Sequence, residues 1–211
     1  MNESTALSKT VLNEIFPYRL TKSDQRRLAI LEAAIKTFSN LSLEYVSYED
    51  IARAGKMSRP LVQHHFPKKR ELFELAIKLV RGQFQEMAVQ AIQKHGHARD
   101  QLNAYISSTF DWVQSRPTHG RMWLLYFYFC HGDKKLRQKH KDLTDVGVQR
   151  IQALLGSISS SNGQIATDLE FKAKSIQRLI TGGLIEVVTE TGIEEVSKVR
   201  DQVLKACSSL L

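Results

Sequence analysis

The side chains best suited to read DNA bases stand together in the segment 58–66. The guanidinium of Arg59 can donate two parallel hydrogen bonds to guanine, and the amide of Gln63 can pair with adenine. His64 can donate to a base acceptor or to a phosphate. Each good base contact contributes about 1–3 kcal/mol of discrimination between base pairs. Three polar residues on a helix are more often only a solvated surface, so this interpretation depends on the elements that carry them.

Two short helices joined by a tight turn are predicted around these side chains. The run Ser47-Tyr-Glu-Asp50 resembles a capping box that opens the first helix, and Gly55 suits a left-handed residue at its end. Ser58 is placed to cap the second helix, and Pro60 lies in its first turn, where a missing N–H costs little. Phe66-Pro67 closes this second helix.

The second helix is expected to have an inner and an outer face. The residues expected to point inward are Met57, Leu61 or Val62, and Phe66. The residues expected to point outward are Arg59, Pro60, Gln63 and His64. Two short helices, a glycine turn and a polar outer face on the second helix are the features of a helix-turn-helix, in which that helix enters the major groove. This setting favours base contacts over a solvated surface.

Residues 26–75 resemble the N-terminal domain of the tetracycline-repressor (TetR) family. The matching residues are Arg27, Ile30-Leu31, Ala33-Ala34, Phe38, Asp50-Ile-Ala52, Ala54-Gly55, Met57-Ser58, His65-Phe66-Pro67, Lys69 and Leu72. Two positions depart from the family pattern. The loop 41–45 lacks the usual glycine, and Gln63 stands where the family usually has a tyrosine that contacts phosphate. That phosphate contact therefore does not carry over, and Gln63 becomes a candidate to read a base.

The resemblance implies a homodimer that binds double-stranded operator DNA and responds to a small-molecule effector. Within it, Ser47 and Tyr48 are implied to meet the DNA backbone, and Lys69 is implied to meet a phosphate. Helix N-termini present unpaired N–H groups and partial positive charge to anions, which agrees with these roles. A solvated basic turn at 68–70 is the alternative. The DNA-binding residues predicted in full are Ser47, Tyr48, Ser58, Arg59, Pro60, Gln63, His64, His65 and Lys69.

Helical periodicity between only four prolines predicts an all-α protein. The first helix is expected behind Thr21 or Ser23 and runs to about 38, and a long one covers 68–94. Later helices are expected at about 98–115, 119–131, 134–159, 165–190 and 193–209, with a loop at 157–163. The predicted domains are an N-terminal extension (1–20), a helix-turn-helix domain (21–70) and a helical effector-binding and dimerisation domain (71–211).

The charge distribution favours an acidic partner. The net charge is +8 with a sequence pI near 9.5, and residues 1–70 carry 12 basic and 7 acidic side chains. Neither a secretory signal nor a membrane-spanning segment is recognisable, so we expect a cytoplasmic protein without a membrane partner. Cys130 and Cys207 have no partner motif and are expected to be reduced and packed.

Two apolar helix faces near the C-terminus are predicted to pair with a second copy of the chain. The predicted dimer residues are Ile176, Ile180, Gly183, Leu184, Val187, Val196, Val199 and Val203. Each of the two glycines at 182–183 costs about 1 kcal/mol in a helix, so close helix approach across the interface is expected, with a local kink as the alternative.

An aromatic cluster between residues 110 and 129 is a candidate effector pocket, although most of its members are expected to be core. The predicted ligand-binding residues are Phe110, Trp112, Met122, Trp123, Tyr126 and Phe127. Aromatic and methionine side chains commonly line sites for apolar or planar ligands, so the effector that releases the repressor is expected to be small and apolar or aromatic.

Other classes of protein are less well supported by the sequence. No nucleophile elbow, P-loop, dinucleotide fingerprint or HExxH helix is present, so no enzyme, catalytic residue or cofactor is predicted. His95-Gly-His97 lacks an acidic or cysteine partner and is interpreted as a solvated turn rather than a metal site. The remaining alternative is an effector-independent architectural or division-linked DNA-binding protein on the same fold.

Overall fold

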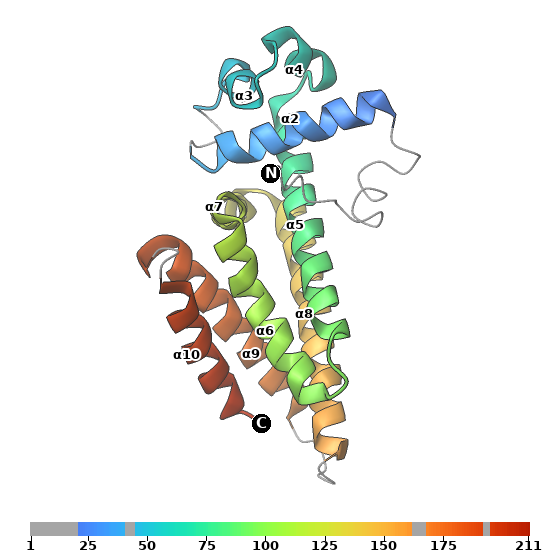
Figure 1. The fold of residues 1–211 in the computed structure, drawn as a ribbon, viewed down its shortest axis with the longest axis vertical. Coiled ribbons are helices and arrows are strands. Elements are labelled where there is room, and N and C mark those ends of the chain that lie inside the picture. The colour runs from blue at the N-terminus through green and yellow to red at the C-terminus, as the bar shows by residue number, and fades with distance from the viewer. Residues whose placement is uncertain (1–20, 41–44, 162–167, 192–194) are drawn as a thin grey trace. The chain divides into compact units, whose positions relative to one another are not determined.

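The computed structural model describes residues 21–40, 45–161, 168–191 and 195–211, which contain helices and no strand (Figure 1). The all-α class is therefore confirmed. The chain divides into two compact units, one of Met1–Glu86 with Arg121–Leu125 and one of Met87–Gly120 with Tyr126–Leu211. We call them unit 1 and unit 2. The predicted extension 1–20 lies outside the described residues, and the functional boundary predicted at residue 70 stays a prediction.

Unit 1 is built on α2 (Lys22–Phe38), α3 (Tyr48–Gly55), α4 (Arg59–His65) and the first part of α5 (Lys69–Gln93). α2 begins after Thr21, one of the two predicted caps, whose hydroxyl and backbone share a capping box with Asp24. α3 packs on α2 and α4 packs on α3. The core of the unit consists of Ile30, Leu31, Ala34, Ile35, Phe38, Val46, Ile51, Val62, Phe66, Leu72, Phe73 and Ala76.

The turn between α3 and α4 differs from the prediction in one residue. Lys56, not Gly55, takes the left-handed conformation, with φ 52°. Gly55 is the last residue of α3, and a Cβ on it would lie 3.0 Å from Cβ of Ala33 and 2.3 Å from Cε of Met57. The glycine is therefore needed for the close approach of α3 to α2, a tertiary reason that the local turn pattern does not contain.

Unit 2 is a bundle of long helices. It contains the end of α5, α6 (Ala98–Ser115), most of α7 (Pro117–Gly132), α8 (Lys134–Ser161), α9 (Leu169–Glu186), a π-helical turn (Val187–Thr191) and α10 (Val196–Ser208). α8 packs against both α6 and α9, while α10 packs against α6 and α9. α9 and α10 lie side by side (Figure 1).

The predicted loop 157–163 is wrong over residues 157–161, because α8 continues to Ser161. The hydroxyls of Ser157 and Ser160 donate to the carbonyls of Ala153 and Gly156 one turn earlier, and Ile158 is buried. The serines are thus accommodated on a helix that core packing extends. Residues 162 and 163 lie outside the described residues.

Both cysteines are buried and unpaired, as expected. Burial raises the pKa of the Cys207 thiol to about 11. In the described part of the chain, no helix has the length and hydropathy needed to cross a bilayer.

Candidate nucleic-acid interface

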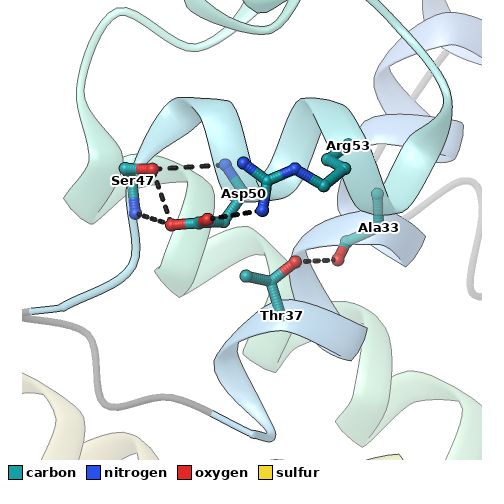
Figure 2. Close-up of polar contacts among 5 residues, drawn as sticks. All are labelled: Ala33, Thr37, Ser47, Asp50 and Arg53. Atoms are coloured by element: carbon teal, nitrogen blue, oxygen red, sulfur yellow. Dashed lines mark hydrogen bonds and ion pairs between the residues drawn. The ribbon is translucent and has the colours of Figure 1, made fainter.

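The N-terminus of α3 is fixed by the predicted capping box (Figure 2). The backbone N–H of Asp50 donates to Oγ of Ser47 at 3.2 Å, and Oδ2 of Asp50 accepts from the backbone N–H of Ser47 at 3.0 Å and from its hydroxyl at 2.6 Å. These hydrogen bonds from Ser47 lower the pKa of Asp50. The hydroxyl of Ser47 already donates its hydrogen bond to Asp50. The one donor of the Ser47 side chain is therefore used within the protein.

α4 presents the side chains predicted to face DNA on its outer surface. The backbone N–H of Leu61 donates to Oγ of Ser58 at 3.4 Å, which caps the helix at the predicted residue. The outward residues Ser58, Arg59, Pro60, Gln63 and His64 are exposed. On the inner face, Val62 and Phe66 are fully buried, which resolves the choice between Leu61 and Val62 in favour of Val62. The orientation predicted for this helix is therefore present.

The C-terminal end of α4 is attached to α2 and α3 by polar contacts. The guanidinium of Arg27 lies 4.5 Å from the centre of the Phe66 ring and donates to the carbonyl of His65 at 3.2 Å. The hydroxyl of Tyr48 donates to the carbonyl of Phe66 at 2.8 Å. These contacts satisfy the last carbonyls of a seven-residue helix and hold its orientation relative to the other two.

Of the three residues implied to contact the DNA backbone, Ser47 is exposed, whereas Tyr48 and Lys69 are half-buried and bonded within unit 1. The ammonium of Lys69 donates to the carbonyl of Val46 at 2.9 Å. An ammonium has three donors, so Lys69 keeps donors for a phosphate, whereas the one proton of the Tyr48 hydroxyl is already donated to Phe66. The phosphate role stays a prediction for both, and for Tyr48 it requires breaking an existing bond.

Positive charge gathers beside the end of α4. The rings of His64 and His65 lie 5.3 Å apart between centroids. Partial burial of His65, and then the neighbouring charges of His64, Arg27 and Arg26, lower the pKa of His65. Arg26 is exposed and stands near the end of α4, a position that the sequence analysis did not single out. Its neighbour Arg27 is one of the residues that match the TetR pattern. The adjacent pair of arginines is therefore the sequence signal that could have identified Arg26.

The six predicted ligand-binding residues are distributed over both units. Met122 and Trp123 belong to unit 1, and Phe110, Trp112, Tyr126 and Phe127 belong to unit 2. All but Phe127 are buried. In unit 2, the hydroxyl of Tyr126 donates to the carbonyl of Leu136 at 3.1 Å, and Trp112 meets His119 edge to face. Each of these aromatic side chains therefore takes part in core packing, and their ligand role stays a prediction.

The eight predicted dimer residues lie in the interior of unit 2, where all are buried within one chain. The two glycines of α9 differ in their surroundings. A Cβ on Gly183 would lie 2.8 Å from Cγ2 of Val203 and 3.0 Å from Cζ of Phe110, while one on Gly182 would meet nothing within 4 Å. The close approach that requires Gly183 is thus between helices of the same chain.

The outer face of α9 and α10 carries a groove of 620 Å³. Its lining is made of Ser175, Arg178, Leu179, Gly182, Gly183, Glu186, Val199, Gln202, Val203, Ala206 and Leu210. Phe171 and Ile185 of α9 are also exposed, by 65% and 37%. This face, rather than the buried stripe, is what α9 and α10 can offer to another molecule.

Comparison with known proteins gives matches of three kinds. Residues 30–76 match the model of the family described as bacterial regulatory proteins, tetR family. The HTH-type transcriptional regulator BetI of Rhizobium meliloti is 26% identical over 113 residues, covering 54% of this chain and 56% of that protein. The chain thus spans little more than half the length of that relative.

Solved structures match over most of the chain. A transcriptional regulator from Saccharomonospora viridis in complex with choline has a TM-score of 0.76 at 20% identity, covering 87% of this chain and 96% of that one. AibR, in complex with isovaleryl coenzyme A and operator DNA, has a TM-score of 0.66 at 18% identity, covering 86% and 97%. At these identities the likeness concerns the fold.

Proposed function

We propose that the chain is a regulator of the TetR type, whose family model residues 30–76 match, and that it is a homodimeric repressor that binds a pseudo-palindromic operator and is released by a small effector. In this proposal α4 is the recognition helix, and each protomer places one α4 in a major groove. Arg59 and Gln63 read bases, His64 contacts a base or a phosphate, and Lys69 contacts a phosphate. The protein works in the cytoplasm and performs no catalytic step.

The observation that carries the proposal is the division of α4 into two faces. Val62 and Phe66 are fully buried, while Arg59, Gln63 and His64 on the opposite side are exposed. Caps at Ser47 and Ser58 and the contacts of Arg27 fix this orientation. A rigid helix with a donor-rich outer face is what base reading requires, since base contacts tolerate little positional error.

The homodimer is supported by the outer face of α9 and α10. The groove and the exposed Phe171 and Ile185 offer apolar surface, and Gly182 leaves room for the backbone of a second helix to approach. Two copies related by a two-fold axis would present two α4 helices to a palindromic site. Three of the predicted dimer residues, Gly183, Val199 and Val203, are among the residues that line this groove.

Effector release is proposed as a shift between two dimer shapes. α5 is a continuous helix with residues in both units, so a change in unit 2 has a direct covalent route to unit 1. An effector that binds the non-DNA shape 100-fold better would weaken the DNA complex by about 2.7 kcal/mol. The structural neighbours bind ligands as different as choline and isovaleryl coenzyme A, so the chemistry of this chain has to identify its own effector.

Binding to genomic DNA fragments, including the promoter of its own gene, at two salt concentrations tests the proposal. We expect a discrete palindromic site with two chains bound, and an Arg59→Ala, Gln63→Ala variant that keeps only salt-sensitive, non-selective binding. Loss of two base contacts corresponds to about 2–6 kcal/mol, at least a 30-fold weaker operator complex. The exposed pair Arg99→Ala, Gln149→Ala in unit 2 is the control. Unchanged selectivity in the α4 variant would overturn the assignment.

An effector-independent DNA-binding protein on the same fold is the alternative. It is favoured by the burial of Phe110, Trp112 and Tyr126, which pack as an ordinary core. Sequence-selective DNA binding that no small molecule of a broad apolar, cationic and anionic panel weakens would support this alternative.

A further inference from the structure

A polar cluster lies inside unit 2, where α6, α8 and α9 pack together (Figure 1). Tyr105 of α6 is 5% exposed, and the guanidinium of Arg150 on α8 lies 5.6 Å from the centre of its ring. Gly147 precedes Arg150 by three residues on α8 and is buried, and Gln177 reaches it from α9. The four residues come from three separate helices and form no recognisable motif.

Gly147 leaves the space that the polar groups occupy. A Cβ at this position would lie 2.7 Å from Oε1 of Gln177 and 3.1 Å from the hydroxyl oxygen of Tyr105. The two polar atoms therefore converge on one point above α8. Glycine inside a helix is less stable than alanine, and here its presence is explained by the room that it leaves for these atoms.

The cluster has unused hydrogen-bonding and charge capacity. Oε1 of Gln177 is buried and accepts no hydrogen bond from the described residues. Arg150 is half-buried and interacts with the ring and hydroxyl of Tyr105, and within the described ranges no carboxylate forms an ion pair with it. Burial raises the pKa of Tyr105 more than Arg150 lowers it, so its hydroxyl keeps its proton. A buried acceptor left unpaired is destabilising, and a bound donor would remove that cost.

We propose that Tyr105, Arg150 and Gln177 form the binding site of a small organic anion that also carries a hydrogen-bond donor, of which a hydroxycarboxylate is the simplest kind. The carboxylate pairs with the planar guanidinium, which can donate two parallel hydrogen bonds to it. The ligand hydroxyl donates to Oε1 of Gln177, and the Tyr105 hydroxyl donates to the carboxylate. The inference rests on the proposed function, since this ligand would be the effector.

The proposed ligand is an anion, whereas one structural neighbour is in complex with the cation choline. A quaternary ammonium is recognised by open aromatic faces, but the face of Tyr105 is already covered by the cation of Arg150. A choline-type ligand would meet like charge there. The two ligand classes therefore predict opposite responses to removal of the Arg150 charge.

Thermal unfolding of the full chain with matched probes tests the site. The probes are glycolate, lactate, 2-hydroxyisovalerate and 2-hydroxyglutarate, their analogues without the hydroxyl, and choline. At least one hydroxycarboxylate is expected to raise the melting temperature more than its analogue does. Arg150→Met and Gln177→Leu should each weaken its apparent binding about tenfold or more, consistent with a hydrogen bond to a charged group. Lys139→Met and Gln149→Leu, on the exposed side of α8, are the matched controls and should bind normally.

The outcomes distinguish this inference from the proposed function. The free Gln177→Leu protein should melt no lower than the wild type, because it loses an unpaired acceptor; a lower melting temperature would mark Gln177 as structural and overturn the site. Failure of every hydroxycarboxylate to stabilise the wild type would also overturn it. Release of operator DNA by choline in the same samples would then leave the effector-responsive function standing, whereas hydroxycarboxylate binding without any effect on DNA would support the site and count against the effector mechanism.

Discussion

The two units begin their helices in different ways. α2, α3 and α4 each start after a serine or threonine whose side chain accepts a backbone N–H, at Thr21, Ser47 and Ser58. In the described part of unit 2, α6, α9 and α10 start without any side-chain cap, and α8 is the exception, because Oδ1 of Asp133 accepts the backbone N–H groups of Lys135 and Leu136. Short helices have few internal hydrogen bonds, so α3 and α4 need local stabilisation, whereas the longer helices depend on packing. Unit 1 is therefore specified locally and unit 2 by its interior.

A half-buried histidine should make the stability of unit 2 sensitive to acid. Burial, and to a smaller extent the charge of Arg116, lowers the pKa of His119 from 6.5 to about 4. The unfolded chain takes up the proton first, so the free energy of unfolding should fall as the pH drops from 6.5 towards 4. The shift corresponds to about 3 kcal/mol in total.

Urea unfolding across this pH range checks the expectation. His119→Gln should flatten the pH dependence, and His95→Gln, which changes an exposed histidine, should leave it as in the wild type. Equal pH dependence in all three proteins would show that the interior of unit 2 does not set its acid response.

Substitutions of the two adjacent glycines of α9 form a matched pair, and their expected effects on the free energy of unfolding are of intermediate size. Gly183→Ala places a methyl group 2.8 Å from Val203, and overpacking of this kind costs about 1–3 kcal/mol. In the single chain, Gly182→Ala meets nothing within 4 Å and should raise the free energy of unfolding by up to about 1 kcal/mol through helix propensity. This is measured on monomeric protein, because the same methyl group would face the second copy in the proposed dimer. Chemical denaturation of both variants measures the difference, and similar effects at the two positions would contradict the packing assigned to unit 2.

The smallest expected effect concerns a cap in unit 1. Ser47→Ala removes the side chain that accepts the N–H of Asp50 and should lower the free energy of unfolding by about 1 kcal/mol. Ser160→Ala removes an exposed hydroxyl that bonds back along α8 and should be close to neutral. Urea titrations of the two variants sharpen the comparison, because equal losses would mean that the cap does not specify α3.

The helix-turn-helix could be predicted because its determinants are local. Ser47 with Asp50, Ser58 and Pro60 mark the ends of α3 and α4 within a few residues of each other. The exception is instructive, since Gly55 is required by contact with Ala33, twenty-two residues earlier, and not by the turn itself. Local patterns located the turn but not the reason for its glycine.

The second unit was predicted less completely because periodicity shows that a face is buried but not what covers it. Ile180 and Val199 form an apolar stripe that is equally consistent with a dimer interface or a core, and the structure buries them within their own chain. Tyr105, Gly147 and Gln177 are brought together only by the packing of three helices, so no spacing in the sequence links them. The residues that could bind an effector in such a bundle are assembled by tertiary packing, so sequence spacing does not identify them.

The burial of both native thiols has a practical consequence for spectroscopy. Cys130 and Cys207 are both buried, and the pKa of the Cys207 thiol, raised to about 11, leaves little thiolate at that residue near neutral pH. A single cysteine introduced at an exposed site of α4 could then be labelled selectively, without first replacing the native residues. Distances between two such spin labels would report directly on how far apart two recognition helices stand, with and without an effector.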